Sequence, residues 1–171
     1  MSSGAKRFAP LYTPEQRRRR NETRWTLVQG ILAPVQFLVF LISLALVVRY
    51  LATGEGFGIA TASIVVKTFV LYAIMITGAI WEKRVFGVYL FAPAFFWEDV
   101  FSMLVIGLHS AYLYALFTGA LSVHAQLWLA LAAYAAYAIN ATQFVLKLRA
   151  ARLGEQRASE LQALALNREA S

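Results

Sequence analysis

ILAPVQFLVFLISLALVV, residues 31–48, is a stretch of 18 residues without a single charged side chain. An α-helix needs about 20 such apolar residues to cross the hydrocarbon core of a bilayer. The surrounding residues extend the apolar run to about 25–52, and the glycine-rich turn TGEGFG at 53–58 ends it. We therefore expect residues 25–52 to form a transmembrane helix.

Three further apolar runs of spanning length follow, at about residues 59–81, 90–118 and 122–146. The chain has 171 residues, of which 60% are hydrophobic and 15% charged, and its mean hydropathy is +0.58. Four spans use most of this length and leave no room for a separate soluble domain. We therefore expect an all-α fold, an integral membrane four-helix bundle over residues 25–149, with any chemistry in or beside the bundle.

The basic residues predict the orientation of the bundle. Of the 16 Lys and Arg residues, 14 lie in the N-terminal segment 1–24, in the link at 82–89, or between Lys147 and the end of the polar tail at 150–171. Because positively charged loops stay in the cytoplasm, we expect four spans with both termini cytoplasmic. The net charge of +7 then lies on one face. Anionic lipid headgroups, rather than nucleic acid, are its expected partner.

The composition also excludes several kinds of site. The chain contains no cysteine, which rules out disulfides, thiolate metal sites, iron–sulfur clusters and cysteine nucleophiles. It contains only two histidines, His109 and His124, so we expect no dense zinc site and no metal bound by the protein itself.

Charged groups inside the third run are the strongest functional signal. Charged side chains are costly in lipid and commonly mark functional sites there, so we interpret Glu98 and Asp99 as functional. Glu98 shares one helical face with His109, whereas Asp99 is rotated by about 100° towards a neighbouring helix. Lys67 in the second run lies at a similar expected depth, and we expect it to be the counter-ion of one of these carboxylates.

Polar residues in the other runs predict a polar interior. The first run carries them at seven-residue intervals and the fourth at three-residue steps. They are Gln29, Gln36, Ser43 and Tyr50 in the first, and Tyr134, Tyr137, Asn140 and Gln143 in the fourth. For Gln36, Ser43 and Asn140 we favour hydrogen bonds between helices over ligand binding.

Several blocks of the sequence carry a resemblance to a known family. GAIWEKRVFG at 78–87, YLFAPAFFWEDVFSMLVIGLH at 89–109 and INATQFVLKLRAARL at 139–153 closely resemble the 3-vinyl bacteriochlorophyllide hydratase family of bacteriochlorophyll biosynthesis. The resemblance covers about residues 12–153 and includes the loops. It implies a hydro-lyase that adds water to the C3-vinyl group of chlorophyllide or bacteriochlorophyllide, giving a 1-hydroxyethyl group, in the inner membrane of phototrophic bacteria. No redox change is involved, so no cofactor is expected, and neighbouring pathway enzymes are expected partners.

The chemistry of that reaction suggests roles for the charged residues. Protonation of the terminal vinyl carbon leaves positive charge beside the macrocycle, and water attacks there, so an acid and a water-orienting base are needed. Two neighbouring carboxyl groups can hold one proton between them while the other stays ionised. We assign Glu98 as acid and Asp99 as base, with the reverse assignment left open. His109 is a candidate for proton transfer or for ligating the substrate's magnesium, and Lys67 for holding one carboxylate ionised.

Substrate binding needs a cation for the propionate and an apolar surface for the ring. Lys83 and Arg84 in the charged link are the candidate cations. Phe95, Phe96 and Trp97 are candidates for stacking on the macrocycle, with ordinary packing as the alternative.

Two other functions remain open at this stage. A non-catalytic tetrapyrrole-binding or assembly protein would need the same pocket but not the two carboxylates. A small proton-coupled transporter would also explain buried charged groups, although the sequence shows no internal repeat or pair of broken helices.

Overall fold

The computed structural model describes residues 11–169, which form five helices and no strand. They are α1 (Pro14–Glu22), α2 (Arg24–Thr53), α3 (Phe57–Phe86), α4 (Phe96–Thr118) and α5 (Val123–Glu169). Within this part of the chain, four helical segments are long and apolar enough to cross a membrane: α2, α3, α4 and residues Val123–Gly154 of α5. The expected all-α fold with four apolar spans is therefore confirmed. The cytoplasmic placement of both ends stays a prediction.

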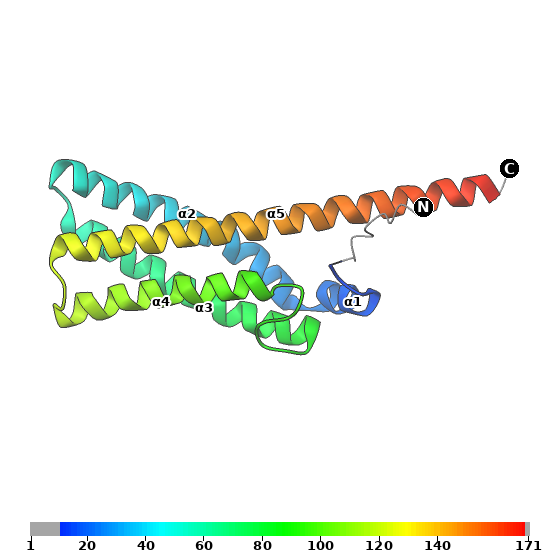
Figure 1. Cartoon of the computed structure of the whole chain (residues 1–171), viewed down its shortest axis with the longest axis horizontal. Coiled ribbons are helices and arrows are strands. Elements are labelled where there is room, and N and C mark those ends of the chain that lie inside the picture. Colours follow the sequence, from blue (N-terminus) through cyan, green and yellow to red (C-terminus); the bar gives the residue numbers. More distant parts are fainter. Residues whose placement is uncertain (1–10, 170–171) are drawn as a thin grey trace, which may run out of the picture.

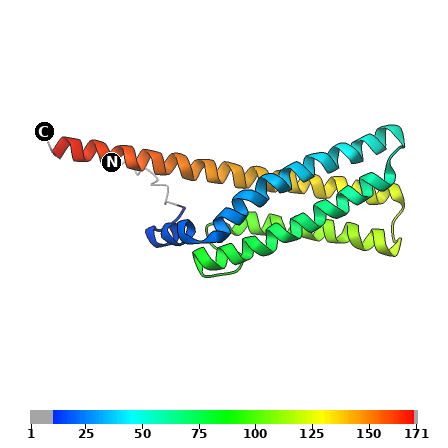
Figure 2. The same cartoon turned by 180° about the vertical axis from the view of Figure 1, so that it is seen from behind.

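The four long helices run alternately up and down (Figures 1 and 2). α2 packs mainly against α3, and α4 packs mainly against α5. The turns at 54–56 and 119–122 lie together at one end, whereas α1, the loop at 87–95 and the continuation of α5 lie at the opposite end. The segments before the first span and after the last one therefore extend from the same end of the molecule.

The second span continues further than its hydropathy indicated. α3 does not stop at 81 but continues to Phe86, so Glu82, Lys83 and Arg84 occupy its last turns and not an extended link. Gly87 then ends the helix with φ of 88°, a left-handed conformation that glycine adopts without steric cost. Glu82 is therefore a buried residue of α3.

The third span starts later than expected. α4 begins at Phe96 and not near Leu90, and residues 87–95 form a loop. Pro93 explains part of this difference, because proline lacks an amide hydrogen and disfavours helical geometry in the residue before it. As a result, Glu98 lies in the first turn of α4, closer to the end of the helix than the sequence predicted.

The fourth helix is longer than its apolar part. α5 runs from Val123 to Glu169, well past the predicted end of the span near 146. The tail after that point is rich in Ala, Leu, Glu, Arg and Gln, which favour helix, and the single Gly154 does not interrupt it. Figure 1 shows this second half of α5 projecting beyond the other helices.

The interior is built from apolar side chains of all four spans. Large side chains that are almost fully buried there include Val47, Ile64, Val105, Tyr112, Leu127 and Tyr134. Many large apolar side chains face outward instead, as expected for helices surrounded by lipid chains; examples are Leu38, Phe69, Leu104 and Val145. The polar side chains between the helices are therefore the feature that needs a chemical explanation.

Candidate active site

Three carboxyl groups meet where α3 ends and α4 begins. Glu82 comes from the last turns of α3, and Glu98 and Asp99 come from the first turn of α4; all three are buried. The carboxyl groups of Glu82 and Asp99 accept hydrogen bonds from consecutive backbone amides, those of Ala92 and Phe91, so they lie close together. Two carboxyl groups buried side by side favour a state in which only one of them is ionised, because neighbouring negative charges repel each other. The pair is therefore a candidate site for holding a proton at the edge of the membrane span.

The same two carboxyl groups also fix the loop at 87–95. The backbone N–H of Phe91 donates to Asp99 Oδ2 at 2.7 Å, and the N–H of Ala92 donates to Glu82 Oε2 at 3.2 Å. Phe91 has φ of 61°, an uncommon left-handed conformation for a bulky residue, and the bond to Asp99 helps to hold it there. Glu82 and Asp99 therefore have a structural role in addition to any chemical one.

Glu98 has a different partner from the one predicted. Its Oε2 lies 2.6 Å from Nζ of Lys147 on α5, in an ion pair that is largely buried on the Glu98 side. The amine of Lys147 also lies 5.0 Å from the centre of the Phe95 ring. The counter-ion of Glu98 is thus Lys147, and the expected pairing of Lys67 with one of the α4 carboxylates is wrong.

Lys67 is paired with His109 in a second polar centre. Both side chains are fully buried, and Nζ of Lys67 donates to Nε2 of His109 at 2.5 Å. The other ring nitrogen, Nδ1, donates to the carbonyl oxygen of Val105 at 2.7 Å. The amine also lies over the rings of Tyr137 and Tyr134, at 4.3 and 5.0 Å from their centres. Neither nitrogen of His109 is free for the magnesium of a substrate in this arrangement.

The two polar centres are well separated along α4. Glu98 and His109 are eleven positions apart, which at a rise of 1.5 Å per residue is roughly 16 Å. The shared helical face of Glu98 and His109 is confirmed, since both are buried on the same side of α4. Because α4 starts at Phe96, however, Glu98 lies near the end of the helix and out of reach of Lys67.

The three aromatic candidates divide into one buried and two exposed residues. Phe95 is only 2% exposed and packs in a cluster with Tyr12, Trp81, Phe86 and Phe144. Phe96 and Trp97 are 43% and 68% exposed, with ring centres 5.5 Å apart. Phe95 therefore serves packing, whereas Phe96 and Trp97 offer an aromatic surface on the outside of α4 beside the carboxyl groups.

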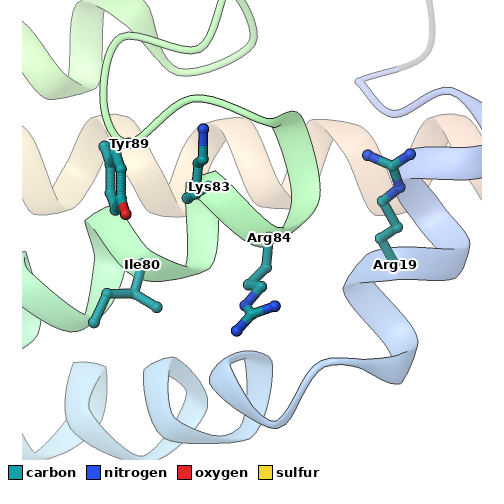
Figure 3. Close-up of a pocket in the computed structure, with 5 residues that line it drawn as sticks. All are labelled: Arg19, Ile80, Lys83, Arg84 and Tyr89. Atoms are coloured by element: carbon teal, nitrogen blue, oxygen red, sulfur yellow. The ribbon is translucent and has the colours of Figure 1, made fainter.

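A basic pocket lies on the other side of the loop. The pocket has a volume of about 450 Å³. It is lined by Arg19, Ile80, Lys83, Arg84 and Tyr89, whose side chains are drawn in Figure 3. Lys83 points towards the loop, where Nζ donates to the carbonyl of Gly87 at 2.7 Å, whereas Arg84 points towards α2. Arg19 is ion-paired with Glu15 at 3.0 Å. Arg84 has no hydrogen bond or ion pair with any other residue of the 11–169 segment, so its guanidinium is available to an anion.

Comparison with known proteins places the chain in a family. Residues 12–150 match the family described as 2-vinyl bacteriochlorophyllide hydratase. The chain belongs to this family. A protein of that name from Cereibacter sphaeroides is 73% identical over 144 residues, which covers 84% of this chain and 89% of the relative. Another of the same name from Rhodobacter capsulatus is 67% identical over 150 residues, covering 88% and 86%. No solved structure matches the chain.

Three residues of this member of the hydratase family were missed by the sequence analysis, although the sequence contains a signal for two of them. Lys83 and Arg84 followed by Gly87 are typical of the last turn and cap of a helix, which would have placed Glu82 on α3. Lys147 continues the polar steps of Asn140 and Gln143 along α5 by one more turn. For Arg19, nothing in the sequence indicated that α1 packs against the end of α3.

No metal centre is formed by the part of the chain that the structure describes. Within residues 11–169, no three histidine, aspartate or glutamate side chains are arranged to hold a metal ion. The carboxyl group of Glu98 is ion-paired with Lys147, and those of Glu82 and Asp99 accept hydrogen bonds from the loop backbone. The arrangement can therefore hold a proton on one carboxyl pair and a negative charge on a third carboxyl group.

Proposed function

We propose that this chain adds water to the vinyl group of a bacteriochlorophyllide or chlorophyllide, producing a 1-hydroxyethyl group. The observation that carries the proposal is the identity of 73% and 67% with two proteins named 2-vinyl bacteriochlorophyllide hydratase, over alignments that include most of the chain. The 2-vinyl group of that name is the C3-vinyl group in systematic tetrapyrrole numbering. The reaction consumes only water and leaves the oxidation level unchanged, so it requires no redox cofactor.

The contacts at the carboxyl cluster favour the reverse of the first assignment of acid and base. A proton must be added to the terminal vinyl carbon, and water must be deprotonated as it attacks the carbon beside the ring. The neighbouring carboxyl groups of Glu82 and Asp99 can share one proton and give it to the substrate. Glu98 is ion-paired with Lys147, which places its carboxylate where it can orient and deprotonate water. In this proposal the pair is the acid and Glu98 is the base.

The loop at 87–95 connects the proposed binding surfaces for the two ends of the substrate. On one side, Phe96 and Trp97 present exposed rings that suit a flat, apolar macrocycle. On the other side, the pocket with Arg84 and Lys83 suits the propionate of the substrate. The carboxyl cluster that anchors this loop then lies near the reacting edge of the ring.

We also propose an orientation in the membrane. α1, with its four consecutive arginines at 17–20, and the basic continuation of α5 extend from the same end of the molecule (Figure 1). Positively charged segments stay in the cytoplasm, so this end is placed on the cytoplasmic side of the bacterial inner membrane. The pathway enzymes that make the vinyl substrate and use the hydroxyethyl product are the expected neighbours there.

The test is to incubate membranes that contain the protein with a 3-vinyl chlorophyllide in oxygen-18 water and to analyse the pigment by mass spectrometry. No nucleotide, flavin or reductant is added. We expect the pigment to gain one labelled water, and we expect Glu98→Gln and Glu82→Gln proteins that still insert and bind pigment to lose this activity. Pigment binding without any gain of mass, under conditions in which a known hydratase turns over, would instead support a tetrapyrrole carrier.

A further inference from the structure

A layer of buried amide side chains lies between the two polar centres. Gln36 on α2 is 1% exposed and Asn140 on α5 is 8% exposed. The side-chain oxygen of Gln143, one turn further along α5, is also buried. These three side chains, Gln36, Asn140 and Gln143, are called the amide layer below.

The contacts of neighbouring residues place the members of the amide layer at one level of the membrane span. The ring of Phe40 on α2 lies 4.9 Å from that of Tyr137 on α5, measured between centres. Gln36 is one helical turn before Phe40, and Asn140 is one turn after Tyr137. Because α2 and α5 run in opposite directions, these two turns lead to the same level (Figure 1). Asn140 Nδ2 also donates to Ser102 Oγ at 2.8 Å, which connects the layer to α4.

Several polar atoms of the amide layer lack a hydrogen-bond partner among the residues that the structure describes. Both polar atoms of Gln36, Oδ1 of Asn140 and Oε1 of Gln143 are buried and have no partner among residues 11–169. Gln29, seven residues earlier on the same stripe of α2, differs in this respect because its Nε2 donates to Thr77 at 2.7 Å. Polar groups in the apolar core of a membrane are costly unless they are satisfied. Buried polar groups that lack a protein partner are typically bonded to an internal water, which makes about three hydrogen bonds.

The position of the layer connects it to the carboxyl cluster. Ser102, which is bonded to Asn140, is one turn from Glu98 on the same face of α4. Gln143 is likewise one turn from Lys147, the partner of Glu98. On its other side the layer is followed by the Lys67–His109 centre. The amide layer therefore lies about one helical turn deeper in the membrane span than Glu98, the carboxylate that the proposed function uses as base.

We propose that the amide layer of Gln36, Asn140 and Gln143 binds internal water and supplies it to Glu98 as the second substrate of the hydration. This inference rests on the proposed function for the use of the water, but not for its presence. Water is scarce deeper in the span, so a molecule held at this layer is bound by its polar groups and stays one helical turn from the proposed base. The layer offers both donors and acceptors, as a bound water requires.

The presence of the water is tested by infrared spectroscopy of the purified protein in lipid nanodiscs. Bands of bound water shift when the medium is changed from ordinary to oxygen-18 water, whereas bands of the protein hydroxyls and amides do not. We expect such bands in the unaltered protein and their loss in Gln36→Leu, which is similar in size but apolar. The matched control is Gln29→Leu, in which a satisfied glutamine of the same stripe is replaced and the water bands should persist.

Kinetics and stability of the same variants complete the test. Gln36→Leu should lower kcat by about 10- to 100-fold with little change in KM for the pigment, since water and not the pigment is misplaced. Gln29→Leu should retain the normal kcat. If Gln36→Leu does not fold, Gln143→Met removes one amide, with its unpartnered oxygen, from the layer and should weaken the same bands.

Three outcomes would overturn the proposal or separate it from the proposed function. Unchanged bands and kcat in Gln36→Leu, with a higher midpoint of thermal unfolding, would show that the amide is simply an unsatisfied group. Loss of the bands from the unaltered protein when pigment binds would show that the layer contacts the macrocycle. If the bands behave as expected but the unaltered protein adds no labelled oxygen to pigment, the water site stands and the hydratase function does not.

Discussion

At the scale of single residues, Lys67 and His109 form a polar contact in which both side chains are fully buried. The amine has one hydrogen-bond acceptor among the residues described, Nε2 of His109. His109→Leu should therefore destabilise the protein by about 3 kcal/mol, because it leaves a buried amine without an acceptor. The measurement is unfolding in detergent followed by circular dichroism.

A double-mutant cycle, in which the amine of Lys67 is removed as well, tests whether the two side chains depend on each other. Adding Lys67→Met to His109→Leu should recover most of the lost stability, since an apolar pair replaces the polar one. If the double variant is instead as unstable as the sum of the two single variants, the two side chains do not depend on each other for stability.

Lys147 is the residue that the proposed chemistry needs to keep Glu98 ionised. Lys147→Met should lower kcat by about 10- to 100-fold and leave KM for the pigment almost unchanged, because the substitution acts on the base and not on binding. Lys147→Arg should retain much of the activity, since a guanidinium can also pair with the carboxylate. Arg149→Met, which removes an exposed cation two residues away, is the control. Equal effects of Lys147→Met and Arg149→Met on kcat would show that only general surface charge matters.

At the scale of elements, the loop at 87–95 depends on the carboxyl groups that bind its backbone. Asp99→Ala should speed hydrogen–deuterium exchange of the Phe91 amide, because this N–H loses its acceptor. Asp99→Asn should retain slow exchange, since the side-chain carbonyl can still accept the bond. Exchange is followed by mass spectrometry of a peptide that contains residues 87–95. The proposed anchoring would be refuted by equal exchange in the two variants.

The same loop explains why the sequence predicted the spans well and their polar contacts less well. Residues 88–96 are as apolar as a transmembrane segment, so hydropathy extended the third span to residue 90. Only Gly87 and Pro93 indicated a break. The shift of about six residues changed the expected depth of Glu98 and hence its expected partner.

At the scale of the whole molecule, periodicity predicted which side chains are buried but not which of them meet. The face of α4 with Glu98, Ser102 and His109 was found from spacing alone, and all three are buried. Their partners on α3 and α5 depend on how far each helix is displaced along its neighbour, and that displacement leaves no periodic signal in one sequence. For this reason the contacts of Lys147 and Glu82 emerge only from the packed structure, although the sequence pattern could have placed both residues on their helices.

The orientation of the whole molecule can be tested because the chain contains no cysteine. Single cysteines at exposed positions, Asn21→Cys in α1 and Ser159→Cys in α5, should react with a membrane-impermeant maleimide only from the cytoplasmic side of sealed vesicles. Glu55→Cys and Ser122→Cys, in the two turns at the opposite end, should react only from the other side. The cations of α1, of the end of α3 and of the continuation of α5 lie at one end of the molecule and give this orientation its physical reason, since moving them across the membrane is costly. Labelling of positions 21 and 159 from opposite sides would mean that an odd number of segments crosses the membrane, and labelling of 122 from the same side as 159 would mean that α5 does not span it.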